Sequence, residues 1–172
     1  MPIELTTPFI ISQILVIFSM VFDFLSFQFK SRKTTFLLFI ISAILICIHY
    51  FLLNKITTGI IMIILIFRFI TCYFTTDKKF MFLFFILNTF ALIFSCTEIY
   101  DLIYYSGSTI SLIGQFQENN KLMRKMMMIG TSFVIVYNFL IFTPMGVVLE
   151  ILFLVSNFIG YYRFYIKKNK IS

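Results

Sequence analysis

The stretch LIYYSGSTISLIGQF, residues 102–116, decides the fold, because whether it crosses a membrane sets the direction of every later segment. It is short, and it is rich in small and polar residues: Ser106, Gly107, Ser108, Thr109, Ser111 and Gly114. Such residues allow close helix approach and interhelical hydrogen bonds inside a bilayer. We therefore expect a helix inside a bundle, in which Ser108 and Ser111 either pack against neighbouring helices or line a water-filled path.

The composition of the whole chain excludes a soluble protein. Of 172 residues, 60% are hydrophobic and 12% are charged, whereas a soluble domain carries about 25% charged residues. The mean hydropathy is +1.01. A membrane-spanning helix needs about 20 apolar residues, so the length permits about seven spans and no domain outside the membrane. The sequence predicts an all-α, polytopic membrane protein.

Apolar runs separated by charge clusters define the other spans. Six runs are predicted to be membrane-spanning helices: residues 9–29, 34–53, 57–75, 80–96, 122–142 and 146–166. Together with residues 102–116 they give seven crossings.

The charge distribution supports the seventh crossing. With all seven, one side of the membrane carries nearly all the cationic residues, namely Lys30, Arg32, Lys33, Lys78, Lys79, Lys121, Arg124, Lys125, Arg163, Lys167, Lys168 and Lys170. The other side carries Lys55, with Glu4, Glu98 and Asp101. Because cytoplasmic loops are enriched in Lys and Arg, we expect the N-terminus outside and the C-terminus in the cytoplasm.

The order of the spans repeats along the chain. The second span ends with His49-Tyr50-Phe51-Leu52, and the sixth ends with Tyr137-Asn138-Phe139-Leu140. In each case a very short outer loop leads to the next span. The chain thus divides into two parallel three-helix bundles, residues 9–75 and 102–166, joined by a linker helix, residues 80–96. This 3+1+3 layout is that of sugar facilitators of the SWEET type, whose solute site lies between the triplets near mid-membrane.

Two ionisable residues inside the spans are natural partners. Asp23 and Arg68 each lie about two helical turns from the cytoplasmic end of their span. An ionisable residue in a span costs about 2.5–3.5 kcal/mol on insertion scales, and it often carries function. We expect an Asp23–Arg68 pair, which either fixes two helices structurally or serves as a gate or solute anchor.

A second polar set is expected near the outer ends of the spans. Gln13, His49, Asn138 and Glu150 share a similar depth, and Asn157 lies two turns beyond Glu150 on the same helical face. These groups suit a polar uncharged solute or a cation, or each bonds to a neighbouring helix. His49 is the only histidine, so a His-rich metal site is excluded. It is either a proton-coupling group or a packed neutral imidazole.

The ordered set of polar and small residues resembles the YgjV-type bacterial inner-membrane proteins over about residues 10 to 166. The positions that carry the resemblance are Gln13, His49 to Leu53, Gly59, Arg68, Gly107, Ser111, Met123, Arg124, Asn138, Phe139, Glu150, Asn157 and Arg163. Tyr137, Leu65 and Tyr104 depart from the family pattern, which has histidine, asparagine and proline there. The resemblance implies a bacterial inner membrane and a distant kinship with SWEET and PnuC-type transporters.

We expect a transporter or facilitator of a small polar solute, with alternating access between the two bundles. A non-transporting membrane scaffold or accessory subunit is the alternative. No nucleophile with a base, acidic pair or metal-ligand spacing appears in the sequence, so neither enzymatic activity nor a cofactor or metal is expected. The expected partners are the lipid bilayer, the solute and a second copy in a homo-oligomer, and nucleic acid is not among them.

Overall fold

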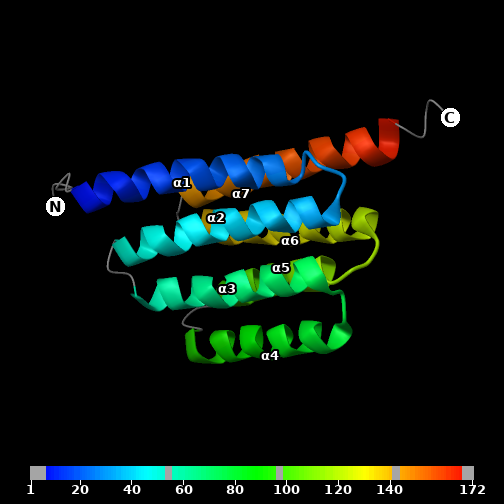
Figure 1. The fold of residues 1–172 in the computed structure, drawn as a ribbon. Coiled ribbons are helices and arrows are strands. Elements are labelled where there is room, and N and C mark those ends of the chain that lie inside the picture. Colours follow the sequence, from blue (N-terminus) through cyan, green and yellow to red (C-terminus); the bar gives the residue numbers. More distant parts are fainter. Residues whose placement is uncertain (1–6, 53–55, 96–98, 141–143, 168–172) are drawn as a thin grey trace. The chain divides into compact units, whose positions relative to one another are not determined.

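A computed structural model describes residues 7–52, 56–95, 99–140 and 144–167. The described residues form helices and no strands, as the sequence predicts (Figure 1). The helices are α1 (Thr7–Ser26), α2 (Arg32–Leu52), α3 (Ile56–Phe74), α4 (Lys78–Ser95), α5 (Asp101–Gln115), α6 (Asn120–Leu140) and α7 (Pro144–Tyr161), followed by the π-helical segment η1 (Tyr162–Lys167).

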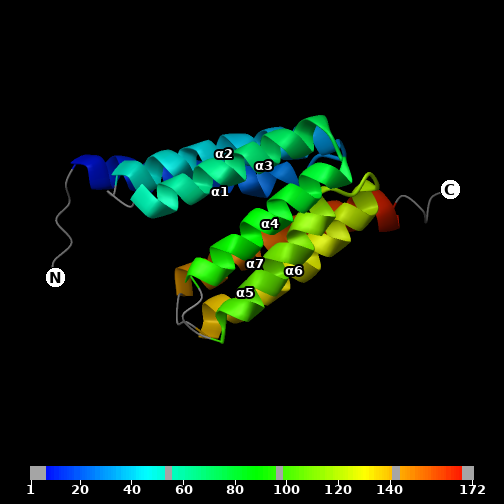
Figure 2. The same ribbon diagram turned by 90° about the horizontal axis from the view of Figure 1, so that it is seen from below.

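The chain forms two compact units, Met1–Tyr73 (unit 1) and Phe74–Ser172 (unit 2). In unit 1, α1 packs along α2, and phenylalanine contacts join α2 to α3. In unit 2, α5 packs against both α4 and α6, and α6 packs against α7 (Figure 2). The predicted division into two triplets and a linker helix stays a prediction.

Helix α1 ends three residues before its predicted end at residue 29. The chain turns there, with the amide of Gln28 bonded to the carbonyl of Leu25 at 2.9 Å. Phe27 lies in this turn with 0% exposure, and its ring meets that of Phe39 edge-on at 5.4 Å. Phe27 thus extends the apolar run beyond the end of α1, and it is buried in the turn that follows the helix.

Within the described residues, a side-chain cap precedes each of three helices. The amide of Thr34 donates to Ser31 Oγ at 3.4 Å before α2, and the amide of Lys79 donates to Asp77 Oδ1 at 2.9 Å before α4. Asn119 Oδ1 accepts from the amides of Lys121 and Leu122 before α6. Such caps satisfy amides that have no partner within the helix, which explains why α4 and α6 begin two residues before the apolar runs do.

Burial along α1 is the reverse of that in a soluble helix. Its buried residues are Ser12, Ser19 and Ser26, spaced by seven residues. The opposite faces carry large apolar side chains, such as Ile17 at 60% exposure and Phe18 at 55%. Small polar residues inside and apolar residues outside are typical of helices packed within lipid.

The buried face of α2 recurs in α6 at a fixed distance along the chain. Both ends of α6 lie 88 residues after the ends of α2. Five buried positions recur at that spacing: Thr35, Phe36, Phe39, Ser42 and Ala43 correspond to Met123, Arg124, Met127, Gly130 and Thr131. Cys47, also buried in α2, corresponds to Ile135, which is half-buried.

The same spacing relates the flanking helices. Buried Ser19 and Ser26 of α1 correspond to buried Gly107 and Gly114 of α5. The caps Ser31 and Asn119 and the first residues of α3 and α7 are also 88 positions apart. The two segments thus repeat in capping and burial, and α2 and α6 also repeat in length, whereas α1 has 20 residues and α5 has 15.

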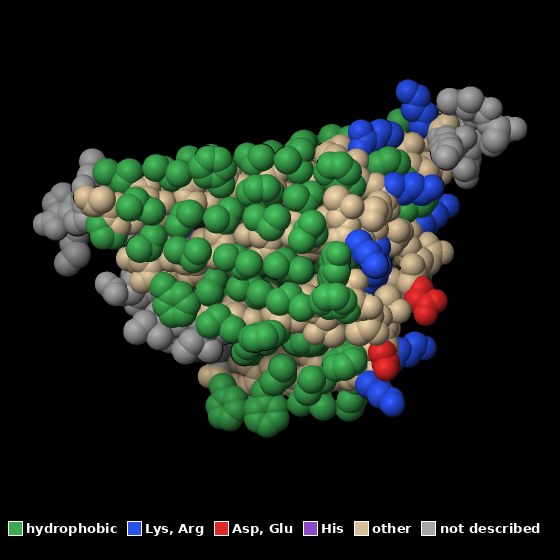
Figure 3. Space-filling view, viewed as in Figure 1, with side chains coloured by type: hydrophobic (Ala, Val, Ile, Leu, Met, Phe, Trp, Pro, Cys, Tyr) green, Lys and Arg blue, Asp and Glu red, His purple; other side chains and the backbone are tan. Residues whose placement is uncertain are grey.

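By length and composition, three of the described helices suffice to cross a membrane: Thr7–Ser26, Arg32–Leu52 and Val147–Lys167. Hydrophobic side chains cover much of the helical surface that faces the viewer in Figure 3, and Lys and Arg side chains gather toward one end of the helices in view. Five residues that contribute to the predicted orientation lie outside the described residues: Glu4, Lys55, Glu98, Lys168 and Lys170.

Candidate functional site

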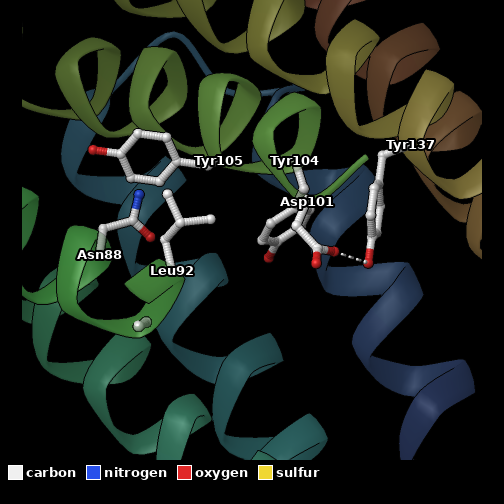
Figure 4. Close-up of a pocket in the computed structure, with 7 residues that line it drawn as sticks. Asn88, Leu92, Asp101, Tyr104, Tyr105 and Tyr137 are labelled. Carbon is white, nitrogen blue, oxygen red and sulfur yellow. Dashed lines mark hydrogen bonds between the residues drawn. The ribbon is translucent and has the colours of Figure 1, made fainter. Parts of the chain in front are cut away.

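A cleft of about 320 Å³ opens in unit 2 where the end of α4, the start of α5 and the end of α6 meet. Its lining residues are Asn88, Ala91, Leu92, Asp101, Tyr104, Tyr105 and Tyr137 (Figure 4). Ligand pockets in proteins run from about 300 to 1,000 Å³. The cleft therefore has room for a small molecule.

Asp101, Tyr104 and Tyr137 lie together in the cleft (Figure 4). The hydroxyl of Tyr137 donates to Asp101 Oδ1 at 3.4 Å. The rings of Tyr104 and Tyr137 are 5.1 Å apart between centroids and inclined by 50°. This arrangement joins α5 to α6 and gives the cleft one carboxylate beside two aromatic rings.

Asn88 and Tyr105 contribute the other polar groups of the cleft. The carboxamide of Asn88 donates to Thr109 Oγ1 at 3.4 Å and accepts from the Ser108 hydroxyl at 3.3 Å. The hydroxyl of Tyr105 lies 2.8 Å from that of Thr89. These bonds between α4 and α5 hold both side chains in place, so the cleft is preorganised.

The predicted residues Gln13 and His49 meet in unit 1 around one serine. The amide of Gln13 donates to Ser12 Oγ at 3.3 Å, and His49 Nδ1 lies 3.0 Å from the carbonyl oxygen of Ser12. These two residues stand 88 positions before Asp101 and Tyr137. In both units, therefore, side chains at corresponding positions join the start of one helix to the end of the next.

Asp23 and Arg68 are both half-buried in unit 1. The carboxylate of Asp23 accepts a hydrogen bond from the hydroxyl of Ser42 on α2. The guanidinium of Arg68 lies 5.7 Å from the ring centroid of Phe69. Asp23 thus bonds across α1 and α2, and its pairing with Arg68 stays a prediction.

Asn157 is 1% exposed and joins α7 to α6 in unit 2, because its amide donates to the carbonyl oxygen of Arg124 at 3.0 Å. The Arg124 side chain, 0% exposed, bonds to Tyr165 of η1. Asn138 and Glu150 are half-buried on α6 and α7. The predicted outer layer draws on residues of both units, and it stays a prediction.

The two predicted pore-lining serines face different neighbours. Ser108 bonds to Asn88 on α4. Ser111 lies on the side of α5 that meets α6, where its hydroxyl adjoins Gly130. Ser108 thus supports a lining residue of the cleft, and Ser111 belongs to the closest contact between α5 and α6.

The sequence pattern did not predict the grouping of Asn88, Asp101, Tyr104, Tyr105 and Tyr137. One signal was present, because Asp101, Tyr104 and Tyr105 lie within five consecutive residues, which places them within about one helical turn. The contribution of α4 had no comparable signal. Asn88 is a single amide in an apolar run, and its position depends on how α4 packs against α5.

Helices that bury serine and glycine, expose phenylalanine and isoleucine, and are long enough to cross a bilayer define an all-helical integral membrane protein. The family Imp-YgjV, described as bacterial inner membrane protein, matches residues 10–168. The chain belongs to this family. No curated protein and no solved structure matches the chain.

Proposed function

We propose that the protein is a transporter or facilitator of a small polar solute that works by alternating access between two three-helix bundles, residues 9–75 and 102–166. The observation that carries the proposal is the recurrence of five buried positions in α2 and α6 at a spacing of 88 residues. Parallel structural repeats are a common design of secondary transporters. In this proposal α4 is the linker helix that gives both repeats one orientation.

The proposed topology has the N-terminus outside and the C-terminus in the cytoplasm. It is supported by the basic residues at the starts of α2, α4 and α6 and in η1, which all fall on one side if every helix crosses. Both repeats then cross the membrane in the same direction.

The polar residues within the helices are the proposed solute contacts. They are Gln13, His49, Arg68, Asn138, Glu150 and Asn157, with Asp23 and Arg68 as gate or ion pair and Ser108 and Ser111 along the path. Polar and ionisable groups within a membrane-spanning helix are costly, and they often mark a transport pathway. Transport by this route requires no covalent step, so the proposed protein is not an enzyme.

The experiment that tests the proposal is flux of radiolabelled small polar solutes into vesicles that contain the purified protein. Glu150→Gln and Arg68→Ala are expected to reduce flux at least about tenfold without unfolding the protein, since each removes a charge from the proposed path. Ser132→Ala is the matched control, because Ser132 is exposed on α6 and bonds only to its own helix.

A membrane scaffold or accessory subunit is the second candidate. Two contacts favour it, because Asn157 bonds to Arg124 and Ser111 packs against Gly130, so both polar residues serve helix packing. Stoichiometric co-purification of another membrane protein, with no flux for any solute tested, would support the scaffold and contradict transport.

A further inference from the structure

We propose that the cleft of unit 2 binds a small organic cation, an alkylated ammonium held by Asp101 and the rings of Tyr104 and Tyr137. As a statement about the transported solute, this inference rests on the proposed function and names its substrate class. As a statement about binding, it can be tested without transport.

The charge of the lining favours a cation. Among the lining residues that the structure describes, Asp101 is acidic, and none is Lys, Arg or His. A carboxylate attracts a cation more strongly in a partly desolvated cleft than in water, because the effective dielectric constant is lower there. An anionic solute would be repelled by this carboxylate and by the electron-rich faces of the tyrosine rings beside it.

The aromatic residues add selectivity for an ammonium group. Tyr104 and Tyr137 present two rings in contact, 5.1 Å between centroids, beside the carboxylate. Ring faces carry negative partial charge, and quaternary ammonium groups are recognised by clusters of such rings. The Tyr137 hydroxyl bonds to Asp101, which fixes the ring relative to the charge.

The remaining wall suits the other end of an elongated solute. Asn88 uses one amide hydrogen on Thr109 and accepts one bond from Ser108. A carboxamide has two donors and two acceptor sites, so Asn88 keeps capacity to bond a hydroxyl or carbonyl of the solute. Ala91 and Leu92 line the same cleft with apolar surface, against which alkyl groups can pack.

Comparison with unit 1 indicates that the charge is specific to this cleft. The positions 88 residues before Asp101 and Tyr137 carry Gln13 and His49. Gln13 is uncharged and bonds to Ser12. The repeat therefore does not require a carboxylate at this position, and the acidic group sits where three tyrosines also gather.

Isothermal titration calorimetry of the full-length protein in detergent, at constant ionic strength, tests the inference. The probes are tetramethylammonium and tert-butanol, which is of comparable size and has no charge. Wild-type protein is expected to bind tetramethylammonium and not tert-butanol. Asp101→Asn and Tyr104→Leu should each weaken tetramethylammonium binding by at least about tenfold.

Asp77→Asn is the matched control, because Asp77 is an exposed carboxylate of the same unit outside the cleft. It should leave tetramethylammonium binding unchanged. Asp101 also lies in the first turn of α5, where a carboxylate offsets the helix dipole. If that were its only role, Asp101→Asn would lower the melting temperature and leave binding intact, and the inference would be wrong.

Other outcomes separate the two proposals. Equal binding of both probes, or no binding of tetramethylammonium, overturns the inference even if an uncharged solute is transported. Binding that depends on Asp101 and Tyr104, with no flux of any ammonium compound in vesicles, supports the cleft as a cation site and contradicts an ammonium compound as the transported solute. Should Asp101→Asn fail to fold, Tyr104→Leu still decides between these outcomes.

Discussion

Unit 1 buries Phe36 of α2 against Phe69 of α3, with ring centroids 6.2 Å apart. The corresponding pair in unit 2, 88 residues later, is Arg124 and Asn157, joined by a hydrogen bond of 3.0 Å. Phe36 and Arg124 are both 0% exposed. The same two positions are thus filled by an aromatic contact in one unit and by a polar one in the other.

The contact between the first two helices of each repeat differs in a related way. In unit 1, Ser19 and Ser42 are buried, and the Ser42 hydroxyl bonds to Asp23. In unit 2 the residues that correspond to these two serines are Gly107 and Gly130. A Cβ added to Gly107 would lie 2.7 Å from the carbonyl oxygen of Gly130, so the helices approach at backbone distance.

These differences indicate that the repeat specifies which positions are buried. The type of residue at each buried position differs between the two units. Without a hydrophobic driving force between helices in lipid, packing depends on fit and hydrogen bonds. A residue that packs well in one unit should therefore lower the free energy of unfolding when it is placed at the corresponding position of the other unit.

The largest effect is expected for Phe36→Arg, which transfers the unit 2 residue to unit 1. It would bury a second guanidinium beside Arg32, whose own guanidinium lies 4.7 Å from the Phe36 ring. We expect the free energy of unfolding to fall by about 3 kcal/mol, measured by reversible unfolding in detergent followed by circular dichroism.

The reciprocal change, Arg124→Phe, should cost less, about 1 kcal/mol or below, because replacing a buried charge by an apolar side chain is often neutral. Equal costs for the two substitutions would contradict the view that each unit has its own packing solution.

Gly130→Ser is expected to have the next largest effect. Its side chain would collide with Ser111, and its Cβ would lie 2.6 Å from the carbonyl oxygen of Gly107. Overpacking of this kind costs about 1–3 kcal/mol, and the same unfolding measurement should show a loss of about 2 kcal/mol.

Ser42→Ala is the control at the corresponding position of unit 1. It removes one hydrogen bond to Asp23 and should cost about 0.6 kcal/mol. If Gly130→Ser lowered the unfolding free energy no more than Ser42→Ala does, the close approach of α5 and α6 would be contradicted.

The smallest effect is expected for Asn157→Leu. Leucine is similar in size to asparagine, but it cannot donate the hydrogen bond to the carbonyl oxygen of Arg124. Interhelical hydrogen bonds in membranes average about 0.6 kcal/mol. The unfolding free energy should therefore fall by less than about 1 kcal/mol. A much larger loss would show that Asn157 does more than join α7 to α6.

Much of the fold was predictable because apolar run length and flanking charges specify membrane helices directly. All seven expected segments are helical among the described residues, and their ends differ by a few residues for local reasons. Phe27 extends an apolar run into a turn, and Asn119 caps α6 before the apolar run begins.

The candidate cleft was less predictable. Gln13, His49 and Asn157 drew notice as polar residues in apolar spans. The bonds of His49 and Asn157 join neighbouring helices, whereas Gln13 bonds within its own helix. Tyr104 was noticed as a departure from a family pattern, and Tyr137 as such a departure and as part of the repeated segment that ends the sixth span. A cleft depends on where three helices diverge, and hydropathy along one chain carries no such information.

The central claim is that the repeats cross the membrane in the same direction, which requires α5 to cross. Its 15 residues span about 22 Å, less than the hydrocarbon thickness of about 30 Å, so this crossing needs the most direct test. Lys30→Cys and Glu118→Cys, at exposed positions 88 residues apart, would be made singly in a chain whose own cysteines are replaced by alanine.

The decisive measurement is the labelling of these two cysteines by a membrane-impermeant maleimide, in intact cells and in inside-out vesicles. We expect both to react only from the cytoplasmic face, and Ile99→Cys, also exposed, to react only from outside. Reaction of positions 30 and 118 from opposite faces would contradict the parallel repeat.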